Sequence, residues 1–254
     1  MKIIAFANQK GGVGKTTSVL NCGAALANSG KNVLLVDMDP QAHLTMGLGM
    51  DANELDHTIY ELLKKESKLK ECLIRFNQIQ KDFSLLPSSI RLSGAESEFS
   101  ALPGREYLLK DSFAELKEPF DYVLLDCPPS LGILTINAFV AASEVYIPLQ
   151  CEFLALHGMH NLLQVISIVK ERLNPELEIT GIIGTMFDGR KSLNKEVLAK
   201  IEEHFGDKLF KTLIRGNVSL AEAPSYGLDI FNYKPNSVGA RDYLNLSEEI
   251  MKRS

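Results

Sequence analysis

A glycine-rich run between a short apolar stretch and a helix-like segment constrains this chain more than any other feature. The apolar stretch covers residues 3–7, and the run that follows it reads Lys10-Gly11-Gly12-Val13-Gly14-Lys15-Thr16-Thr17. Glycine tolerates positive φ and a close approach of the backbone, so the N–H groups of such a loop can converge on one anion. The N-terminus of the following helix adds its partial positive charge. The run therefore predicts a strand, a phosphate-binding loop and a helix in succession.

Each polar side chain of this loop has its own chemical task. Lys15 would reach the terminal phosphates of a nucleotide, and Thr16 carries the hydroxyl that such loops offer to Mg²⁺. The standard pattern GxxxxGK[ST] fails here, because Gln9 stands where its first glycine would be. What remains is a deviant form, KGGxGKTT, with an extra lysine, Lys10, at its first position. We expect every residue of the run, from Lys10 to Thr17, to contribute to nucleotide binding.

Apolar runs alternate with helical patterns along almost the whole chain. The apolar runs cover residues 3–7, 33–37, 83–87, 122–126, 145–149, 179–186 and 209–214, and the helical patterns cover 15–29, 157–173, 193–205 and 240–251. Strands that are apolar at consecutive positions are typical of a sheet that is buried on both faces. We therefore expect an α/β fold: a mostly parallel, twisted sheet with helices on both faces and its ligand at the carboxyl ends of the strands.

The chain shows no internal repeat or linker, so we expect a single domain over residues 1–254. Residues 51–80 form the most polar stretch, with helix-like pieces at 59–65 and 69–76. We interpret this stretch as a peripheral insertion with a solvated face.

Composition and charge narrow the class of protein. Apolar residues make up 45% of the chain and charged residues 23%, values that are ordinary for a globular protein. A net charge of −5 argues against a generally basic nucleic-acid binder but permits a local basic patch. The four cysteines are widely spaced, which favours reduced thiols over a zinc site or a disulfide framework. Without a signal peptide or a long apolar run, the sequence predicts a cytoplasmic protein with no membrane segment.

Two of the apolar runs end in aspartates that complete a phosphate site. Asp126 closes one run, and an aspartate in that place can hold Mg²⁺ through water. Asp37 and Asp39 close another and would share a face of an extended strand. An aspartate at a strand end is often only a helix cap or a turn residue. With the loop in the same chain, we expect Asp126 to serve the metal and Asp39 the reacting water, and Asp37 stays open.

Transfer of a phosphoryl group to water requires neutralised charge and one positioned water. Lys15, Thr16 and Asp126 can supply the first, and Asp39 can orient the water. Lys10 can then stabilise the developing charge best from a partner subunit, in the manner of an arginine finger. These residues predict a nucleotide-bridged homodimer with Lys10, Lys15 and Asp39 as its catalytic groups.

Several segments together resemble the ParA/Soj family of partitioning ATPases, within the P-loop NTPases with a deviant Walker A motif. The resemblance covers essentially the whole chain and rests on Asn8-Gln9, Asp37-Met38-Asp39-Pro40-Gln41, Asp126-Cys127-Pro128-Pro129-Ser130-Leu131-Gly132 and Glu222-Ala223-Pro224-Ser225-Tyr226-Gly227. Pro87-Ser88-Ser89 and Arg105-Glu106-Tyr107-Leu108-Leu109 are also similar to family signatures.

The resemblance implies a function and a set of roles. Such ATPases bind ATP and Mg²⁺, dimerise around two ATP molecules, bind double-stranded DNA without sequence preference, and hydrolyse ATP slowly until a ParB-like partner stimulates them. They are nucleoid-associated and partition chromosomes or plasmids. By position, the signature lysine, phosphate lysine, Mg²⁺ ligand, hydrolytic aspartate and Walker B acid are Lys10, Lys15, Thr16, Asp39 and Asp126. Asn217 falls where the family has an asparagine that contacts the nucleotide base, although a loop asparagine is more often a turn residue.

One segment departs from the family pattern. The family reads Ile-Pro-Arg-Asn-Val-Arg-Leu-Ser before Glu-Ala-Pro-Ser, and its two arginine positions are occupied here by Gly216 and Ser219. One of those arginines is associated with DNA contact. The replacements we expect at a phosphate-contacting patch are Arg190, Lys191, Lys211 and Arg215, with Lys195 and Lys208 as further candidates. Few such contacts would mean weak DNA binding with a shallow salt dependence.

Two alternatives stay open. The chain could be an orphan relative that positions a protein cargo and uses DNA only as a track, which the two altered arginine positions favour. It could also be a MinD-type ATPase that cycles on membranes through an amphipathic tail. The chain ends in Glu248-Glu249-Ile250-Met251-Lys252-Arg253-Ser254, and the apolar residues of its last helix are better explained by core packing.

Overall fold

A single mixed sheet forms the centre of the protein in the computed structural model, which describes residues 1–78, 81–116, 120–152 and 157–253. Seven strands of this described part follow the order β3-β4-β2-β5-β1-β6-β7. Their bounds are β1 Lys2–Phe6, β2 Val33–Asp37, β3 Ile74–Gln78, β4 Lys81–Leu86, β5 Tyr122–Asp126, β6 Glu144–Gln150 and β7 Glu178–Thr185. Only the edge pair β3–β4 is antiparallel. The expected α/β fold with a mostly parallel sheet is confirmed.

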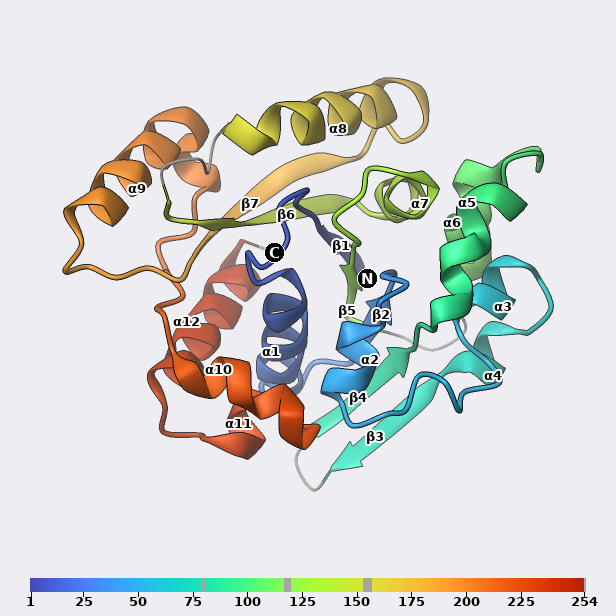
Figure 1. Ribbon diagram of the computed structural model, residues 1–254, viewed down its shortest axis with the longest axis horizontal. Helices are drawn as coiled ribbons and strands as arrows, with labels where there is room; N and C mark the ends of the chain where they lie inside the picture. Colours follow the sequence, from blue (N-terminus) through green and yellow to red (C-terminus); the bar gives the residue numbers. More distant parts are fainter. Residues whose placement is uncertain (79–80, 117–119, 153–156, 254) are drawn as a thin grey trace.

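Helices cover both faces of this sheet (Figure 1). Leu34 and Val36 of β2 face one core, which is shared with α7 and α8, whereas Val33 and Leu35 face the other, shared with α1 and α12. This alternation explains why the strands read as continuous apolar runs. The helices are α1 Lys15–Asn28, α2 His43–Gly47, α3 Ile59–Leu63, α4 Leu69–Cys72, α5 Ala95–Glu98, α6 Leu108–Phe113, α7 Ile133–Ala141, α8 His160–Arg172, α9 Ser192–Phe205, α10 Val218–Glu222, α11 Ile230–Tyr233 and α12 Val238–Lys252.

The register of the three central strands brings the candidate site residues together at the edge of the sheet formed by the carboxyl ends of the strands. Phe6, the last residue of β1, pairs with Asp126 of β5, and Asp126 also pairs with Asp37 of β2. The phosphate-binding loop leaves β1 at the same edge. Parallel strands bring their carboxyl ends together, so residues far apart in sequence meet here.

Two expectations about local structure were wrong. Residues 69–76 form only the short helix α4 before the chain enters β3, where Phe76 stacks on Phe83 of β4 with the ring centroids 5.0 Å apart. Residues 209–214 do not form a strand. They touch β7 through an isolated bridge, and the backbone N–H groups of Lys211 and Thr212 donate to the carboxylate of Glu249. A side chain of α12 therefore binds two backbone N–H groups of this segment, whereas those of Phe210 and Ile214 donate to carbonyl oxygens of β7 at 2.9 and 2.8 Å.

No helix within the described residues is both long and apolar enough to cross a bilayer.

Gly181 lies where β7 packs most tightly. A Cβ atom there would come within 2.5 Å of the Phe210 ring and 2.6 Å of the Tyr146 ring, and both rings are buried. We expect Gly181→Ala to lower the free energy of unfolding by about 1–3 kcal/mol, because a full core must shift to accept the methyl group. Urea denaturation measures this loss. Gly158→Ala is the matched control, since nothing lies within 4 Å of its added Cβ; equal stability of the two variants would contradict the packing.

Candidate active site

The glycine-rich loop has the conformation that its sequence requires. Gly12 and Gly14 have φ angles of 75° and 88°, in the left-handed region that disfavours side chains. Gly14 directly precedes α1, so the loop opens onto the N-terminus of that helix. The Thr185 hydroxyl, at the end of β7, donates to the carbonyl oxygen of Val13 at 2.9 Å. The loop is thereby fixed to the sheet and presents its N–H groups to an anion.

Lys15 is buried at the first position of α1, and its Nζ lies 3.4 Å from the carbonyl oxygen of Lys10. Burial lowers the pKa of the Lys15 ammonium group, while the charges of Asp126, Cys127 and Asp39 oppose that shift. A buried cation beside carboxylates, at a helix N-terminus, is an arrangement that binds phosphate. The role of Lys15 at the phosphates stays a prediction.

Asp126 is a buried carboxylate that lacks hydrogen-bond partners. Neither of its oxygens has one among the described residues. Burial raises its pKa well above the ordinary value, and Asp37 adds to the rise. The Thr16 hydroxyl lies close enough to lower that pKa, although no hydrogen bond of good geometry joins the two side chains. A buried polar group without a partner is costly. Mg²⁺ prefers oxygen ligands and keeps water in its shell, so Thr16 and Asp126 together fit this ion.

The neighbouring aspartates, Asp37 and Asp39, differ in what they contact. Asp37 is fully buried and accepts from the Thr45 N–H at 2.9 Å, the Thr45 hydroxyl at 2.7 Å and the Asp39 N–H at 3.1 Å. Burial raises its pKa to about 7 despite these donors. Asp39 is partly exposed, and its carboxylate accepts from the Gln41 N–H at 2.9 Å. Asp37 is therefore occupied by the backbone around it, and Asp39 is the aspartate of the pair that can reach a solvent molecule.

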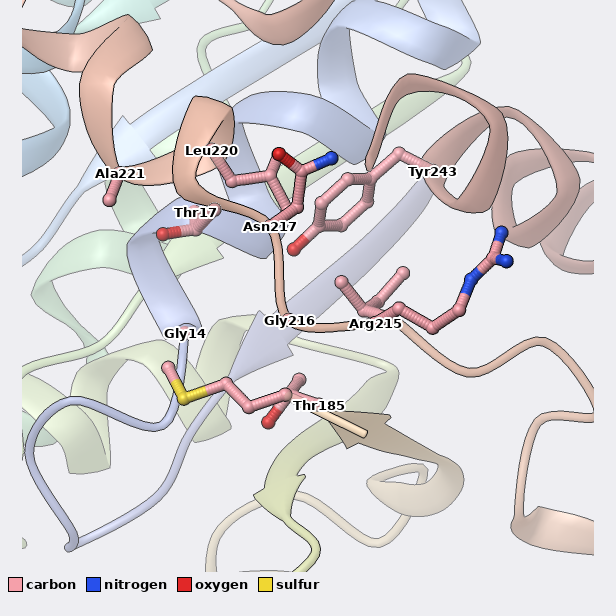
Figure 2. A pocket seen from close by; sticks show the side chains of 11 residues that line it. Gly14, Thr17, Thr185, Arg215, Gly216, Asn217, Leu220, Ala221 and Tyr243 are labelled. Carbon is pink, nitrogen blue, oxygen red and sulfur yellow. The ribbon is translucent and has the colours of Figure 1, made fainter. Parts of the chain in front are cut away.

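A pocket adjoins the loop on the side of α10 and α12 (Figure 2). Figure 2 shows Asn217 and Tyr243 on one side of it and Thr185 on the other. Asn217 is the cap residue of α10, with its Oδ1 accepting from the Ser219 N–H at 2.8 Å. Asn217 thus does act as a local turn and cap residue, the alternative that the sequence left open. Asn217 also lines the pocket together with Gly14 and Thr17, and its contact with a nucleotide base stays a prediction.

Lys10 points away from this site. Its Nζ lies 3.3 Å from Oε2 of Glu152, and both side chains are about half exposed. Its backbone N–H donates to the Asn8 side chain, whose Nδ2 donates to the carbonyl oxygen of Pro148. The backbone of Lys10 is therefore held in place, while its ammonium group stays at the surface.

Comparison with known proteins identifies the family. A sequence family described as an AAA domain matches residues 1–179. The chromosome-partitioning ATPase Soj of Treponema pallidum (strain Nichols) is 49% identical over 252 residues, which cover 99% of this chain and 98% of that protein. The chain belongs to the ParA/Soj family. The chromosome partitioning protein ParA of Caulobacter vibrioides (strain NA1000 / CB15N) is 42% identical over 255 residues, with 100% and 95% coverage. The members of this family are partitioning ATPases, and the resemblance seen in the sequence is confirmed.

A solved structure supports the same fold. The cobyrinic acid a,c-diamide synthase of Mycobacterium smegmatis with bound ATP analogue and magnesium has a TM-score of 0.87 and 37% identity, covering 100% of this chain and 95% of that one. Its name is that of a biosynthetic enzyme, whereas the ParA and Soj relatives above are more similar in sequence.

The basic residues proposed for DNA contact come from two segments of this ParA/Soj fold, one directly after β7 and one before α10. Arg190 and Lys191 follow β7. An isolated backbone β-bridge between Phe187 and Arg215 brings Arg215 to the same end of that strand. Lys211 lies four residues before Arg215 in the sequence, and its backbone N–H donates to the carboxylate of Glu249. Arg190 is fully extended into solvent, 91% exposed, but pairs with Asp188 at 2.9 Å.

Arg215 is the candidate with the strongest partner. Its Nε and its backbone N–H each donate to Oδ2 of Asp242 at 3.0 Å, and Asp242 is almost fully buried. This pairing raises the pKa of the Arg215 guanidinium. Its charge is largely neutralised, which weakens it as a substitute for the missing family arginines.

The residues that hold the site in place were not predicted from the sequence. Thr185 fixes the glycine-rich loop, Thr45 donates to the carboxylate of Asp37, and Ser88, which follows β4, donates to the carbonyl oxygen of Asp39. The local sequence carries no signal for Thr185. Ser88 lies in a segment that the resemblance singled out without assigning it a role.

Proposed function

We propose that this partitioning ATPase binds ATP and Mg²⁺, dimerises in the ATP state, binds double-stranded DNA without sequence preference, and is stimulated by a ParB-like partner. The observation that carries the proposal is the buried pair of Lys15 and partnerless Asp126 directly beside the glycine-rich loop. The solved relative with a bound ATP analogue and magnesium supports the same ligands for this chain. The protein would act in the cytoplasm on nucleoid DNA and partition a chromosome or plasmid.

In this mechanism the loop and Lys15 hold the phosphates, and Thr16 with Asp126 holds Mg²⁺, which neutralises phosphate charge when bound. Asp39 orients the attacking water. Lys10 reaches the nucleotide of a partner subunit, so it must leave Glu152. Exposed ion pairs contribute about 0–1 kcal/mol, and that contact is therefore easily exchanged for a phosphate. Hydrolysis is slow in the single chain because no partner subunit supplies its Lys10 to the nucleotide.

DNA binding in this proposal is weak and has a shallow salt dependence. Arg190, Lys191 and Lys211 supply the phosphate contacts, with Arg215 contributing little while it is bound to Asp242. Each neutralised phosphate adds to the slope of affinity against salt, so few contacts give a shallow slope. The paired state of Arg215, with Gly216 and Ser219 at the family's arginine positions, favours a second candidate function: positioning of a protein cargo.

The membrane-cycling alternative has less support. Three of the apolar side chains of α12, Tyr243, Leu246 and Ile250, are buried in the core that α12 shares with α1. An amphipathic membrane anchor needs its apolar face free to enter the lipid. We therefore propose a cycle without membrane binding.

The variant Asp39→Ala tests the proposed function. We expect its ATP hydrolysis to fall by about a hundredfold, because the water loses its orienting group, while ATP binding is retained and the dimer accumulates. The measurement is its binding to random-sequence duplex DNA with ATP, with ADP or without nucleotide, over a salt series.

Binding only with ATP, weakening as salt rises, supports the partitioning cycle. The double variant Arg190→Ala/Lys191→Ala, in the Asp39→Ala background, should then weaken binding at every sequence alike. An ATP dimer that binds no DNA would favour a protein cargo. Hydrolysis at the wild-type rate by Asp39→Ala would show that another residue positions the water.

A further inference from the structure

A closed ring of hydrogen bonds surrounds the backbone of Asp39. Its N–H donates to Oδ1 of Asp37 at 3.1 Å, and Oδ2 of Asp37 accepts from the Thr45 hydroxyl at 2.7 Å. The Thr45 oxygen accepts from the Ser88 N–H at 3.0 Å. The Ser88 hydroxyl then donates to the carbonyl oxygen of Asp39 at 2.8 Å, which closes the ring. Both backbone polar groups of Asp39 are thus held by side chains.

The ring joins three separate segments. Asp37 ends β2, Thr45 lies in α2, and Ser88 follows β4, which pairs with β2 in the sheet. The side chains of Asp37, Thr45 and Ser88 are all fully buried. A buried network whose donors and acceptors are all matched is rigid, because breaking one bond leaves a desolvated group without a partner.

This rigidity is directed at one side chain. Fixing the N–H and the carbonyl oxygen of a residue fixes the direction in which its Cα–Cβ bond points. The carboxylate of Asp39 is then set by its own torsions and by the Gln41 N–H. A group that orients water must be held in place, since a misplacement of about 1 Å can cost about a hundredfold in rate.

We propose that Thr45 and Ser88 are positioning residues for ATP hydrolysis, which act by fixing the backbone of Asp39. This inference rests on the proposed role of Asp39 in orienting water. Neither residue needs to contact the nucleotide, so both affect the rate of hydrolysis rather than the binding of ATP.

The expected effects follow from the bonds that each variant removes. Ser88→Ala deletes the bond to the Asp39 carbonyl oxygen, which keeps a second donor in the Ala42 N–H at 2.9 Å. We expect kcat to fall by about fivefold to tenfold, which corresponds to the free energy that one hydrogen bond typically contributes. Thr45→Val keeps the shape of the side chain but removes two links of the ring, and we expect a loss of about thirtyfold or more. Thr45→Ser keeps the hydroxyl and should restore kcat to within about threefold.

The experiment compares these variants with wild type and Asp39→Ala. It measures kcat, the affinity for a fluorescent ATP analogue, and the fraction of dimer with ATP by light scattering after size exclusion. We expect Thr45→Val and Ser88→Ala to lower kcat, to keep ATP affinity within about twofold, and to accumulate the ATP dimer as Asp39→Ala does. A merely structural defect would reduce the dimer. Ser89→Ala is the matched control, because this neighbouring buried serine lies outside the ring.

The outcomes separate the inference from the proposed function. If Asp39→Ala is inactive while Ser88→Ala and Thr45→Val hydrolyse ATP at the wild-type rate, the positioning role is wrong and the role of Asp39 stands. A parallel loss of ATP affinity and rate, or a Thr45→Ser variant no better than Thr45→Val, also contradicts the inference. If Asp39→Ala itself hydrolyses ATP at the wild-type rate, the proposed role of Asp39 fails first. Should Thr45→Val not fold in urea denaturation controls, Ser88→Ala alone decides the question.

Discussion

Replacing Lys15 with alanine should lower the affinity for ATP by about a hundredfold or more. The Lys15 ammonium group is buried at the N-terminus of α1, and a charged hydrogen bond to phosphate contributes about 1.5–3 kcal/mol. The variant would also leave the buried carboxylate of Asp126 without its nearby cation, so the site would repel phosphate. Titration with a fluorescent ATP analogue in the presence of Mg²⁺ measures the change.

A control must separate lost binding from lost folding. Lys31→Ala removes a lysine beyond the opposite end of α1 and should bind ATP like the wild type. Thermal unfolding without nucleotide should show Lys15→Ala to be folded, since it loses an ammonium group whose burial already carries a cost. A folded Lys15→Ala protein with wild-type ATP affinity would remove Lys15 from the phosphate site.

The parts of the fold that could be predicted are those whose signal is local. The glycine-rich loop needs left-handed backbone at Gly12 and Gly14, and the sequence supplies glycine there. Apolar runs closed by aspartate likewise predict strands that end at a polar edge, as β2 and β5 do. For these elements the chemistry of neighbouring residues decides the structure, so reading the chain in order is enough.

The parts that could not be predicted depend on contacts between distant segments. Residues 209–214 have the composition of a strand, but Glu249 of α12 takes the backbone N–H groups of Lys211 and Thr212. Residues 74–76 have a helix-like pattern, but β4 offers them a strand to pair with. In both cases tertiary contacts override local propensity.

The residues of the candidate site also fall into those that the local sequence predicts and those that depend on distant segments. Lys15, Asp39 and Asp126 could be proposed from the sequence, because Lys15 stands in the glycine-rich run and each aspartate follows an apolar run of the same chain. Thr45, which donates to Asp37, lies 8 residues away along the chain, and Ser88 lies 43 residues beyond Thr45, so nothing near Thr45 or Ser88 indicates that they meet. The paired state of Arg215 is equally invisible, since Asp242 lies 27 residues later.

Lys10→Ala should lower the rate of ATP hydrolysis by about a hundredfold to a thousandfold while leaving ATP binding within a few-fold of wild type. The side chain of Lys10 lies at the surface against Glu152, so it contributes little to binding within one chain. Its loss therefore lowers only the rate of hydrolysis, because Lys10 would approach the phosphate of the nucleotide bound to a partner subunit and stabilise the developing charge there. The variant should also stay monomeric with ATP in size-exclusion chromatography, and an intact ATP dimer would remove this role.

Mixing two inactive variants decides whether Lys10 acts within its own chain or across the dimer. In a heterodimer of Lys10→Ala and Asp39→Ala, the site on the Lys10→Ala chain keeps its own Lys15 and Asp39 and receives Lys10 from the partner. Action across the interface therefore predicts that the mixture regains hydrolysis at one of its two sites, although each variant alone is inactive. Action within the chain predicts no recovery, because one subunit then lacks the lysine and the other lacks the aspartate. Adding Lys15→Ala to the Lys10→Ala chain is the matched control: it should abolish the recovery, since the only complete site then loses its phosphate-binding lysine.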